Sequence, residues 1–338
     1  MDLNMLWFIL VGVLFAGYAI LDGFDLGVGM LQLGLKDDTD RRICYNAIGP
    51  VWDGNEVWLV TGGGALFAAF PEVYATVFSG FYLAFMLLLF ALIFRAIAIE
   101  FRSKEKWTWW RRMWDYGFFG GSFLASFLIG VAMGNIAWGI PLDADFEYAG
   151  GFLNLLHPYA LWMGVTTVAL FLMHGSIYLV LKTEGHLQER LRSWVNPLII
   201  IFIIAYAVLT LATLLYLPHM TETLKENPAL FILAVLLVLA IANIPREIHH
   251  GREFMAFLSS CVTMLLLMSL FGLGMFPNMV YSVPEAANSI TAYNGSSTQK
   301  TLKIMSIIAL IGVPIVLSYT ACIYWIFRGK VTLTKDSY

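Results

Sequence analysis

Long runs of apolar residues, separated by short polar segments, dominate the chain. Most runs reach about 20 residues, the length that an α-helix needs to cross the hydrocarbon core of a bilayer. Residues 83–94 are apolar on every side, whereas a membrane β-strand alternates apolar and polar positions. We therefore expect an all-α, polytopic membrane protein of about nine spans. The expected helices cover residues 6–33, 48–70, 74–99, 114–140, 158–181, 195–217, 229–244, 253–275 and 302–327.

The composition supports this class of protein. Apolar residues make up 59% of the 338 residues and charged residues only 13%, against about 25% in an ordinary soluble domain. This excludes a soluble enzyme, a nucleic-acid-binding protein and a secreted disulfide scaffold. Cys44, Cys261 and Cys322 are far apart and form no Cys-x-x-Cys motif, which argues against a zinc site and covalently attached haem. No Lys or Arg precedes the first apolar run and no clear cleavage site follows it, so we expect a membrane helix rather than a removable signal peptide.

Almost all lysine and arginine residues fall on one side of the expected membrane. If the N-terminus lies outside, 16 of the 20 lie in inner loops or the C-terminal tail, Arg95 lies within the third span, and only Lys225, Lys300 and Lys303 lie outside. Because cytoplasmic loops carry the excess of positive charge, we expect the N-terminus outside and the C-terminus inside, which requires an odd number of spans. The inner residues are Lys36, Arg41, Arg42, Arg102, Lys104, Lys106, Arg111, Arg112, Lys182, Arg190, Arg192, Arg246, Arg252, Arg328, Lys330 and Lys335.

The segments outside the membrane are short. The longest are the inner loop 100–113 and the polar outer segment 276–301, and neither is long enough for a soluble domain. We therefore expect a single integral membrane domain over residues 1–338, compatible with two four-helix bundles and one peripheral helix. The helices cover about 6–140 for the first four, about 158–275 for the next four and about 302–327 for the ninth.

Four carboxylates interrupt the first two apolar runs. Asp22 and Asp25 lie three residues apart in the first span, and Asp53 and Glu56 lie three apart in the second, so each pair shares a helix face. At 1.5 Å per residue, Asp22 and Asp25 lie about 24 and about 28 Å below the outer start of their helix, and Asp53 and Glu56 about 8 and about 12 Å above the inner start of theirs. All four are thus expected in the same inner layer of the membrane.

Acidic residues within a membrane are costly and usually have a function. Closely spaced buried carboxylates cannot all ionise together, so one of them can hold a proton near neutral pH, as a proton relay from the cytoplasm requires. A cation site, or a structural network paired with Arg95, would use the same residues, and the sequence leaves these alternatives open. We expect Glu100, and Asp115 with Arg111 and Arg112, to lie at the membrane interface.

The histidines do not indicate a haem site in this chain. Of the six, only His174 lies clearly within a span, and no two are placed to sandwich a haem from inside the bundle. We expect His174 to make a hydrogen bond within the bundle. Gly62–Gly64 lies in the second span with no Lys-Ser/Thr after it, so it predicts close helix packing and not a phosphate-binding loop.

The motifs around the four acids resemble subunit II of the cytochrome bd-type quinol oxidases. The two main matches are LDGFDLGVGML, residues 21–31, and GPVWDGNEVWLVTGGGALFAAFP, residues 49–71. One departure is Val51, where several relatives have a histidine, so no role of that histidine is carried over. Shorter matches, which extend the resemblance over essentially the whole chain, are FSGFY at 78–82, RSK at 102–104, RRMWDYGFFGGSF at 111–123, GVAMGN at 130–135 and MFPNM at 275–279.

The resemblance implies a subunit of a terminal respiratory oxidase in the prokaryotic cytoplasmic membrane. In that family a homologous subunit I carries two haem b, haem d and the quinol site, and the electrogenic complex passes electrons from quinol to dioxygen. Subunit II supports subunit I and is expected to supply a cytoplasmic proton path. The resemblance thus implies no cofactor and no residue of oxygen chemistry in this chain. The candidates for proton transfer are Asp25, the best single candidate, Asp22, Asp53 and Glu56, with Arg95 as a charge partner.

Several alternatives stay open from the sequence. A proton- or cation-coupled secondary transporter would use the same acids, although such folds often show internal repeats and broken helices. A purely structural assembly subunit would use them only for pairing. A small single-helix subunit, membrane lipid and a quinone inside the fold are further partners that the sequence neither indicates nor excludes, and it does not tell which quinone is used.

Overall fold

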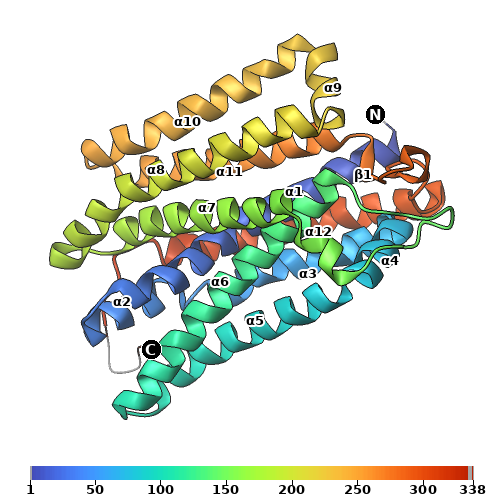
Figure 1. Ribbon diagram of the computed structural model, residues 1–338. Coiled ribbons are helices and arrows are strands. Elements are labelled where there is room, and N and C mark those ends of the chain that lie inside the picture. Colours follow the sequence, from blue (N-terminus) through green and yellow to red (C-terminus); the bar gives the residue numbers. More distant parts are fainter. Residues whose placement is uncertain (1, 334–336, 338) are drawn as a thin grey trace.

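The computed structural model describes residues 2–333 and 337, and within them the fold is helical apart from one short two-stranded sheet. Successive long helices run back and forth along one direction, from the end that carries the N-terminus to the end that carries α2 (Figure 1). We call these the N-terminal end and the α2 end. The elements are α1 (Leu3–Leu31), α2 (Asp38–Ile48), α3 (Trp52–Ala69), α4 (Pro71–Gly80), α5 (Tyr82–Phe101), α6 (Thr108–Trp138), α7 (Pro158–Lys182), α8 (Gly185–Tyr216), α9 (His219–Glu226), α10 (Phe231–His249), α11 (Glu253–Met275), β1 (Asn278–Val280), β2 (Ile290–Thr291) and α12 (Gln299–Ile326).

Eight helices of the described chain are long and apolar enough to cross a membrane, which confirms an all-α, polytopic membrane protein. They correspond to eight of the nine expected spans, with different bounds in several of them. The second expected span corresponds to α3, which has 18 residues and packs along α1 but is not among the eight. Asp53, Asn55, Glu56 and the glycines of α3 make it less apolar than its neighbours.

Three other expectations differ from the structure. The helix expected over 74–99 is divided into α4 and α5, because the backbone of Phe81 leaves the helical region at φ −104° and ψ 18°. The helix expected over 229–244 continues through Pro245 to His249 as α10. The helix expected from 195 begins at Gly185, so that α8 extends well beyond the apolar run. The span 253–275 has the expected bounds.

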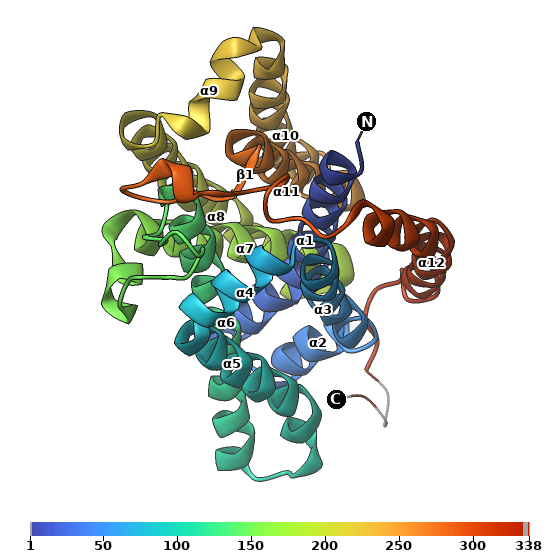
Figure 2. The same cartoon turned by 90° about the vertical axis from the view of Figure 1, so that its right-hand side faces the viewer.

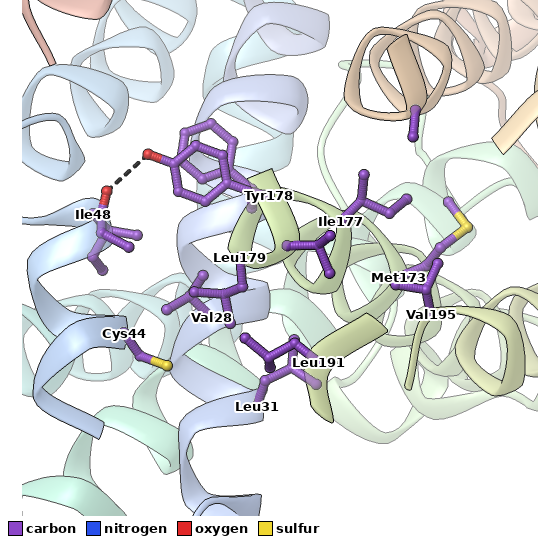
Figure 3. Packing of buried hydrophobic residues seen from close by; sticks show 14 of the residues in the cluster. Val28, Leu31, Cys44, Ile48, Met173, Ile177, Tyr178, Leu179, Leu191 and Val195 are labelled. Carbon is purple, nitrogen blue, oxygen red and sulfur yellow. Dashed lines mark hydrogen bonds between the residues drawn. The ribbon is translucent and has the colours of Figure 1, made fainter. Parts of the chain in front are cut away.

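The core lies where α1, α7, α8 and α11 meet. Buried apolar side chains from α1, α2, α7 and α8 interdigitate there, and the Tyr178 hydroxyl donates a hydrogen bond to the Ala47 carbonyl at 2.8 Å (Figure 3). α1 and α7 approach closely, because Gly27 faces Gly175: a β-carbon added at Gly175 would lie 2.7 Å from Gly27 Cα. Gly62 likewise faces the Phe15 ring, as expected for close packing, but nothing lies within 4 Å of a β-carbon at the other two glycines of that run.

α12 lies at the periphery of the molecule (Figure 2). Leu302 is its only buried residue, and its neighbours are α1 and α3. Segment 276–301, expected on the outer side, contains the β1–β2 hairpin and packs on α1 at the N-terminal end. Asn4 donates a hydrogen bond to the Ala292 carbonyl at 3.0 Å, and Trp7 donates to the Leu302 carbonyl at 3.0 Å. Lys335, one of the expected inner charges, lies outside the described residues.

Candidate functional site

Arg95 of α5 holds a carboxylate from each of two neighbouring helices. Its two terminal nitrogens donate to the two carboxylate oxygens of Asp22 on α1, at 2.8 and 2.5 Å, and Nη1 also donates to Glu56 Oε1 on α3 at 3.0 Å. The side chains of Arg95 and Asp22 are fully buried, whereas Glu56 is 24% exposed. The guanidinium fork matches a carboxylate in this bidentate geometry. Asp22 is therefore a firmly paired carboxylate.

Asp25, one helical turn further along α1, is also fully buried but is compensated much less. Arg95 Nη2 lies 3.9 Å from Asp25 Oδ2, and that oxygen accepts a hydrogen bond from Asn55 Nδ2 at 2.7 Å. The other oxygen, Asp25 Oδ1, is buried and has no hydrogen-bond partner. A carboxyl oxygen in this position is a suitable place for a proton, because a neutral acid needs no counter-charge in an apolar interior.

The charges of this cluster do not balance. Three carboxylates, those of Asp22, Asp25 and Glu56, lie within 4.0 Å of a single guanidinium. Burying an ion without a partner costs several kcal/mol, about 3–5 kcal/mol when one member of a buried pair is removed. The arrangement therefore favours a proton on one carboxyl group, and Asp25 has the weakest contact with Arg95.

Asp53 does not join this cluster. The side chain of Asp53 is exposed on the surface of the chain. No hydrogen bond or ion pair connects it to any residue that the structure describes. The structure thus brings together three of the four acids singled out from the sequence, with Arg95 as their partner. Asp53 precedes Glu56 by three residues on the same helix, at the edge of the cluster.

Two further residues belong to the site. Asn55 donates to both Asp25 Oδ2 and the Leu21 carbonyl. Tyr324, near the end of α12, donates its hydroxyl proton to Asn55 Oδ1 at 2.8 Å. Asn55 lies inside the acidic motif and could have been found from it. Tyr324 lies 269 residues away in an apolar run and carries no local sequence signal.

A second ionic cluster lies at the α2 end. Asp115 is buried, and its two oxygens accept hydrogen bonds from Arg102 Nε at 2.6 Å and Arg41 Nη1 at 2.7 Å. Asp115 was expected at the membrane interface, and the structure shows that it is buried within this ionic cluster near the start of α6. Arg111 instead contacts Asp38, which also pairs with Arg102. These contacts join α2, α6 and the turn that follows α5. The cluster therefore holds three segments together.

The pKa of Asp38 reflects this environment. Partial burial alone would raise the pKa, but the hydrogen bond and positive charge of Arg102, with the charge of Arg111, lower it below the usual value of an aspartate. Asp38 therefore stays ionised at neutral pH and over much of the acidic range. This indicates a structural ion pair and not a proton carrier.

His174 is fully buried and both of its ring nitrogens are engaged. Nε2 lies 2.9 Å from the Ile20 carbonyl, which can only accept, and Nδ1 lies 2.8 Å from the Ser260 hydroxyl. This confirms the expected hydrogen bonding within the bundle and leaves no ring nitrogen for a haem iron. No group of three or more His, Cys, Asp or Glu side chains in the described part of the chain could hold a metal ion.

Comparisons with known proteins give a consistent result. Residues 3–327 match the family described as cytochrome bd terminal oxidase subunit II. The chain is 37% identical to the cytochrome bd-I ubiquinol oxidase subunit 2 of Escherichia coli (strain K12), over 98% of this chain and 95% of that protein. It is also 37% identical to the cytochrome bd ubiquinol oxidase subunit 2 of Bacillus subtilis (strain 168), over 98% and 97%. The structure resembles the bd oxidase from Geobacillus thermodenitrificans with a TM-score of 0.81 at 14% identity, over 97% and 99% of the two chains, a similarity of fold.

Proposed function

The chain belongs to the cytochrome bd terminal oxidase subunit II family, and from this premise we propose that its buried carboxylates carry protons for the oxidase. As a member of the family, it is a subunit of a terminal quinol oxidase, a haem-containing complex that also contains a subunit I. It is a multi-pass bacterial membrane protein. The proposals below concern how this chain serves that complex.

The central proposal is a proton path that passes through Asp25. Reduction of dioxygen to water consumes protons, and these must reach a site within the membrane. Asp25 Oδ1 would hold the proton, and Asn55 together with the nearby guanidinium of Arg95 would stabilise the carboxylate after the proton leaves. Asp22 would serve chiefly to hold Arg95 in place. The observation that carries this proposal is the unpartnered, buried oxygen of Asp25.

Glu56 and Asp53 would take the proton from Asp25 to the surface of the chain. Glu56 shares Arg95 with the buried acids and is partly exposed, and Asp53 is exposed one helical turn away. An aspartate facing lipid is expensive. We therefore propose that subunit I covers this face of α3, so that protons pass from α3 to the haem-bearing subunit. This chain would then carry no step of oxygen chemistry itself.

The positive charges at the α2 end support an orientation with this end in the cytoplasm and the N-terminus outside. We propose the plasma membrane as the location. We further propose a single domain over residues 1–338, built as two four-helix bundles with α12 as the peripheral helix. The lone buried residue of α12 supports this arrangement.

We place the two haem b, the haem d and the quinol site in subunit I. His174, the histidine that lies clearly within a span, does not fit a haem iron, because both of its ring nitrogens are engaged. Mass spectrometry of the complex, purified through a tag on this chain, would identify subunit I and any small single-helix subunit, lipid or quinone. We expect a second large subunit in the purified complex. Its reduced-minus-oxidised absorbance spectrum should show haem b and haem d bands. A colourless chain without a partner, from membranes that contain the oxidase, would contradict it.

The alternative within the complex is a purely structural role, for which the paired Asp22 provides a specific observation. The two carboxylates separate these roles. Asp25→Asn keeps the shape and the hydrogen bond to Asn55, so we expect quinol oxidase turnover to fall by about 10²-fold with the haem spectrum intact. Asp22→Asn weakens the pairing of buried Arg95, so we expect loss of assembled complex. Full turnover of Asp25→Asn would contradict the proton path, and loss of haem in that variant would support a scaffold.

A further inference from the structure

Tyr324 connects the peripheral helix to the carboxylate cluster. Its hydroxyl donates to Asn55 Oδ1 at 2.8 Å, and Asn55 Nδ2 donates to Asp25 Oδ2 at 2.7 Å. The three residues come from α12, α3 and α1. Leu302 is the only residue of α12 that is fully buried, and Ile323 and Tyr324 are partly buried against the main core. The hydroxyl of Tyr324 adds to this packing a direct hydrogen-bonded contact between the peripheral helix and the site.

The hydroxyl fixes which way the amide of Asn55 points. An amide oxygen accepts and an amide nitrogen donates, so the two ends are not equivalent. With Oδ1 bound to Tyr324, the nitrogen faces α1, where it donates to both Asp25 Oδ2 and the Leu21 carbonyl at 3.1 Å. Without the hydroxyl, the oxygen would lose this partner. A rotated amide would then direct its oxygen at the carboxyl group of Asp25.

The position of Tyr324 is set at the α2 end. Lys182, the last residue of α7, donates from Nζ to the Phe327 carbonyl and, at 2.9 Å, to the Gly329 carbonyl. The Val331 backbone nitrogen donates in turn to the Lys182 carbonyl at 2.9 Å. These bonds hold the segment that directly follows Tyr324. The Tyr324 hydroxyl therefore stays within hydrogen-bonding distance of Asn55.

We propose that Tyr324 is a positioning residue of the proton path. It orients the Asn55 amide so that the amide occupies Asp25 Oδ2, which leaves Oδ1 as the atom that receives and releases the proton. This inference rests on the proposed role of Asp25. The other titratable or charged groups around Asp25 are Asp22, Glu56, Arg95 and Tyr178, and Cys261 of α11 lies near Tyr324.

The test compares two tyrosines of α12 in the intact, purified oxidase. Tyr324→Phe removes only the hydroxyl. Tyr319→Phe is the matched control, since Tyr319 is 64% exposed on the same helix. Turnover is measured together with the infrared difference band of the Asp25 carboxyl group, assigned by its loss in Asp25→Asn. Tyr324→Phe is expected to lower turnover by about fivefold, the factor that corresponds to one hydrogen bond, and to shift the Asp25 band. Tyr319→Phe should change neither, and both variants should keep the haem spectrum.

Wild-type turnover and an unshifted Asp25 band in Tyr324→Phe would overturn the inference. If this variant fails to assemble, Asn55→Ala interrupts the hydrogen bonds from Tyr324 to Asp25 at their middle residue. An unshifted Asp25 band in Asn55→Ala would overturn the inference equally. The two proposals fail in distinguishable ways. If Asp25→Asn retains full turnover, the proton path itself is wrong. If Asp25→Asn is inactive but Tyr324→Phe behaves as wild type, only the positioning role is wrong.

Discussion

Arg95 and Asp22 form a bidentate ion pair with both side chains fully buried, at 2.8 and 2.5 Å. Asp25, three residues along the same helix, lies 3.9 Å from the same guanidinium. One turn of α1 therefore separates a carboxylate that is held by its counter-ion from one that has an unpartnered oxygen. We infer that the first keeps the arginine in the membrane and that the second carries the proton.

Replacing Arg95 by methionine should prevent stable assembly. The change leaves Asp22 and Glu56 without their counter-charge, and breaking a buried ion pair in this way costs about 3–5 kcal/mol. The yield of haem-containing complex and its thermal midpoint measure the effect. The double variant Asp22→Leu with Arg95→Met removes both partners and should recover part of the loss. A double variant no better than the single one would show that the two residues are not coupled.

Adding one methyl group at Gly27 should weaken the contact between α1 and α7. A β-carbon at this position would lie 2.9 Å from Gly175 Cα, and overpacking of this kind costs about 1–3 kcal/mol. Gly12→Ala is the matched control, because nothing lies within 4 Å of a β-carbon at that position of the same helix. We expect a lower thermal midpoint for Gly27→Ala alone. Equal midpoints for the two variants would contradict the close approach of the helices.

The contribution of Asp38 to stability should disappear in acid. Folding lowers the pKa of Asp38, so its ion pairs with Arg102 and Arg111 stabilise the fold above the unfolded-state pKa, about 3.9. This contribution is lost as the pH falls through the still lower folded-state pKa. The difference in thermal midpoint between wild type and Asp38→Asn should therefore be constant from about pH 7 to about pH 5 and shrink as the pH falls below that range. Asp40→Asn, in the same helix, serves as the control, and a difference that grows on acidification would contradict the ion pairs.

His174→Gln should keep every haem band of the complex. The substitution disturbs the hydrogen bonds to Ser260 and the Ile20 carbonyl, and an unmade buried hydrogen bond costs about 1–3 kcal/mol. A lower thermal midpoint with an unchanged reduced-minus-oxidised spectrum is the expected result. Loss of a single haem band from an assembled complex would mean that His174 is an iron ligand.

Charged residues within apolar runs were the most informative part of the sequence. Asp22, Asp25, Glu56 and Arg95 stand out there, because a membrane tolerates few such residues, and the structure places them in contact. The helix break at Phe81 could not be read in this way. Ser79 and Gly80 come directly before the break, but no charged residue interrupts the run between Glu72 and Arg95, so hydropathy alone gives no boundary.

Contacts between distant segments account for the remaining differences. The partners of buried Asp115 include Arg41, 74 residues earlier, and the local sequence carries no signal for this contact. Tyr324 looks like an ordinary lipid-facing aromatic residue until α12 is placed beside α3. Pro245 lies inside α10, about one turn before its end, and the helix continues past it to His249.

The central claim is that protons for oxygen reduction pass through Asp25. Its most direct test is the rate of proton uptake when the fully reduced complex is mixed with dioxygen, followed with a pH-indicator dye in wild type and in Asp25→Asn. Haem absorbance, recorded in the same experiment, shows that the variant is assembled and reduced. We predict that uptake slows by about 10²-fold in the variant. Proton uptake at the wild-type rate in Asp25→Asn would contradict the account.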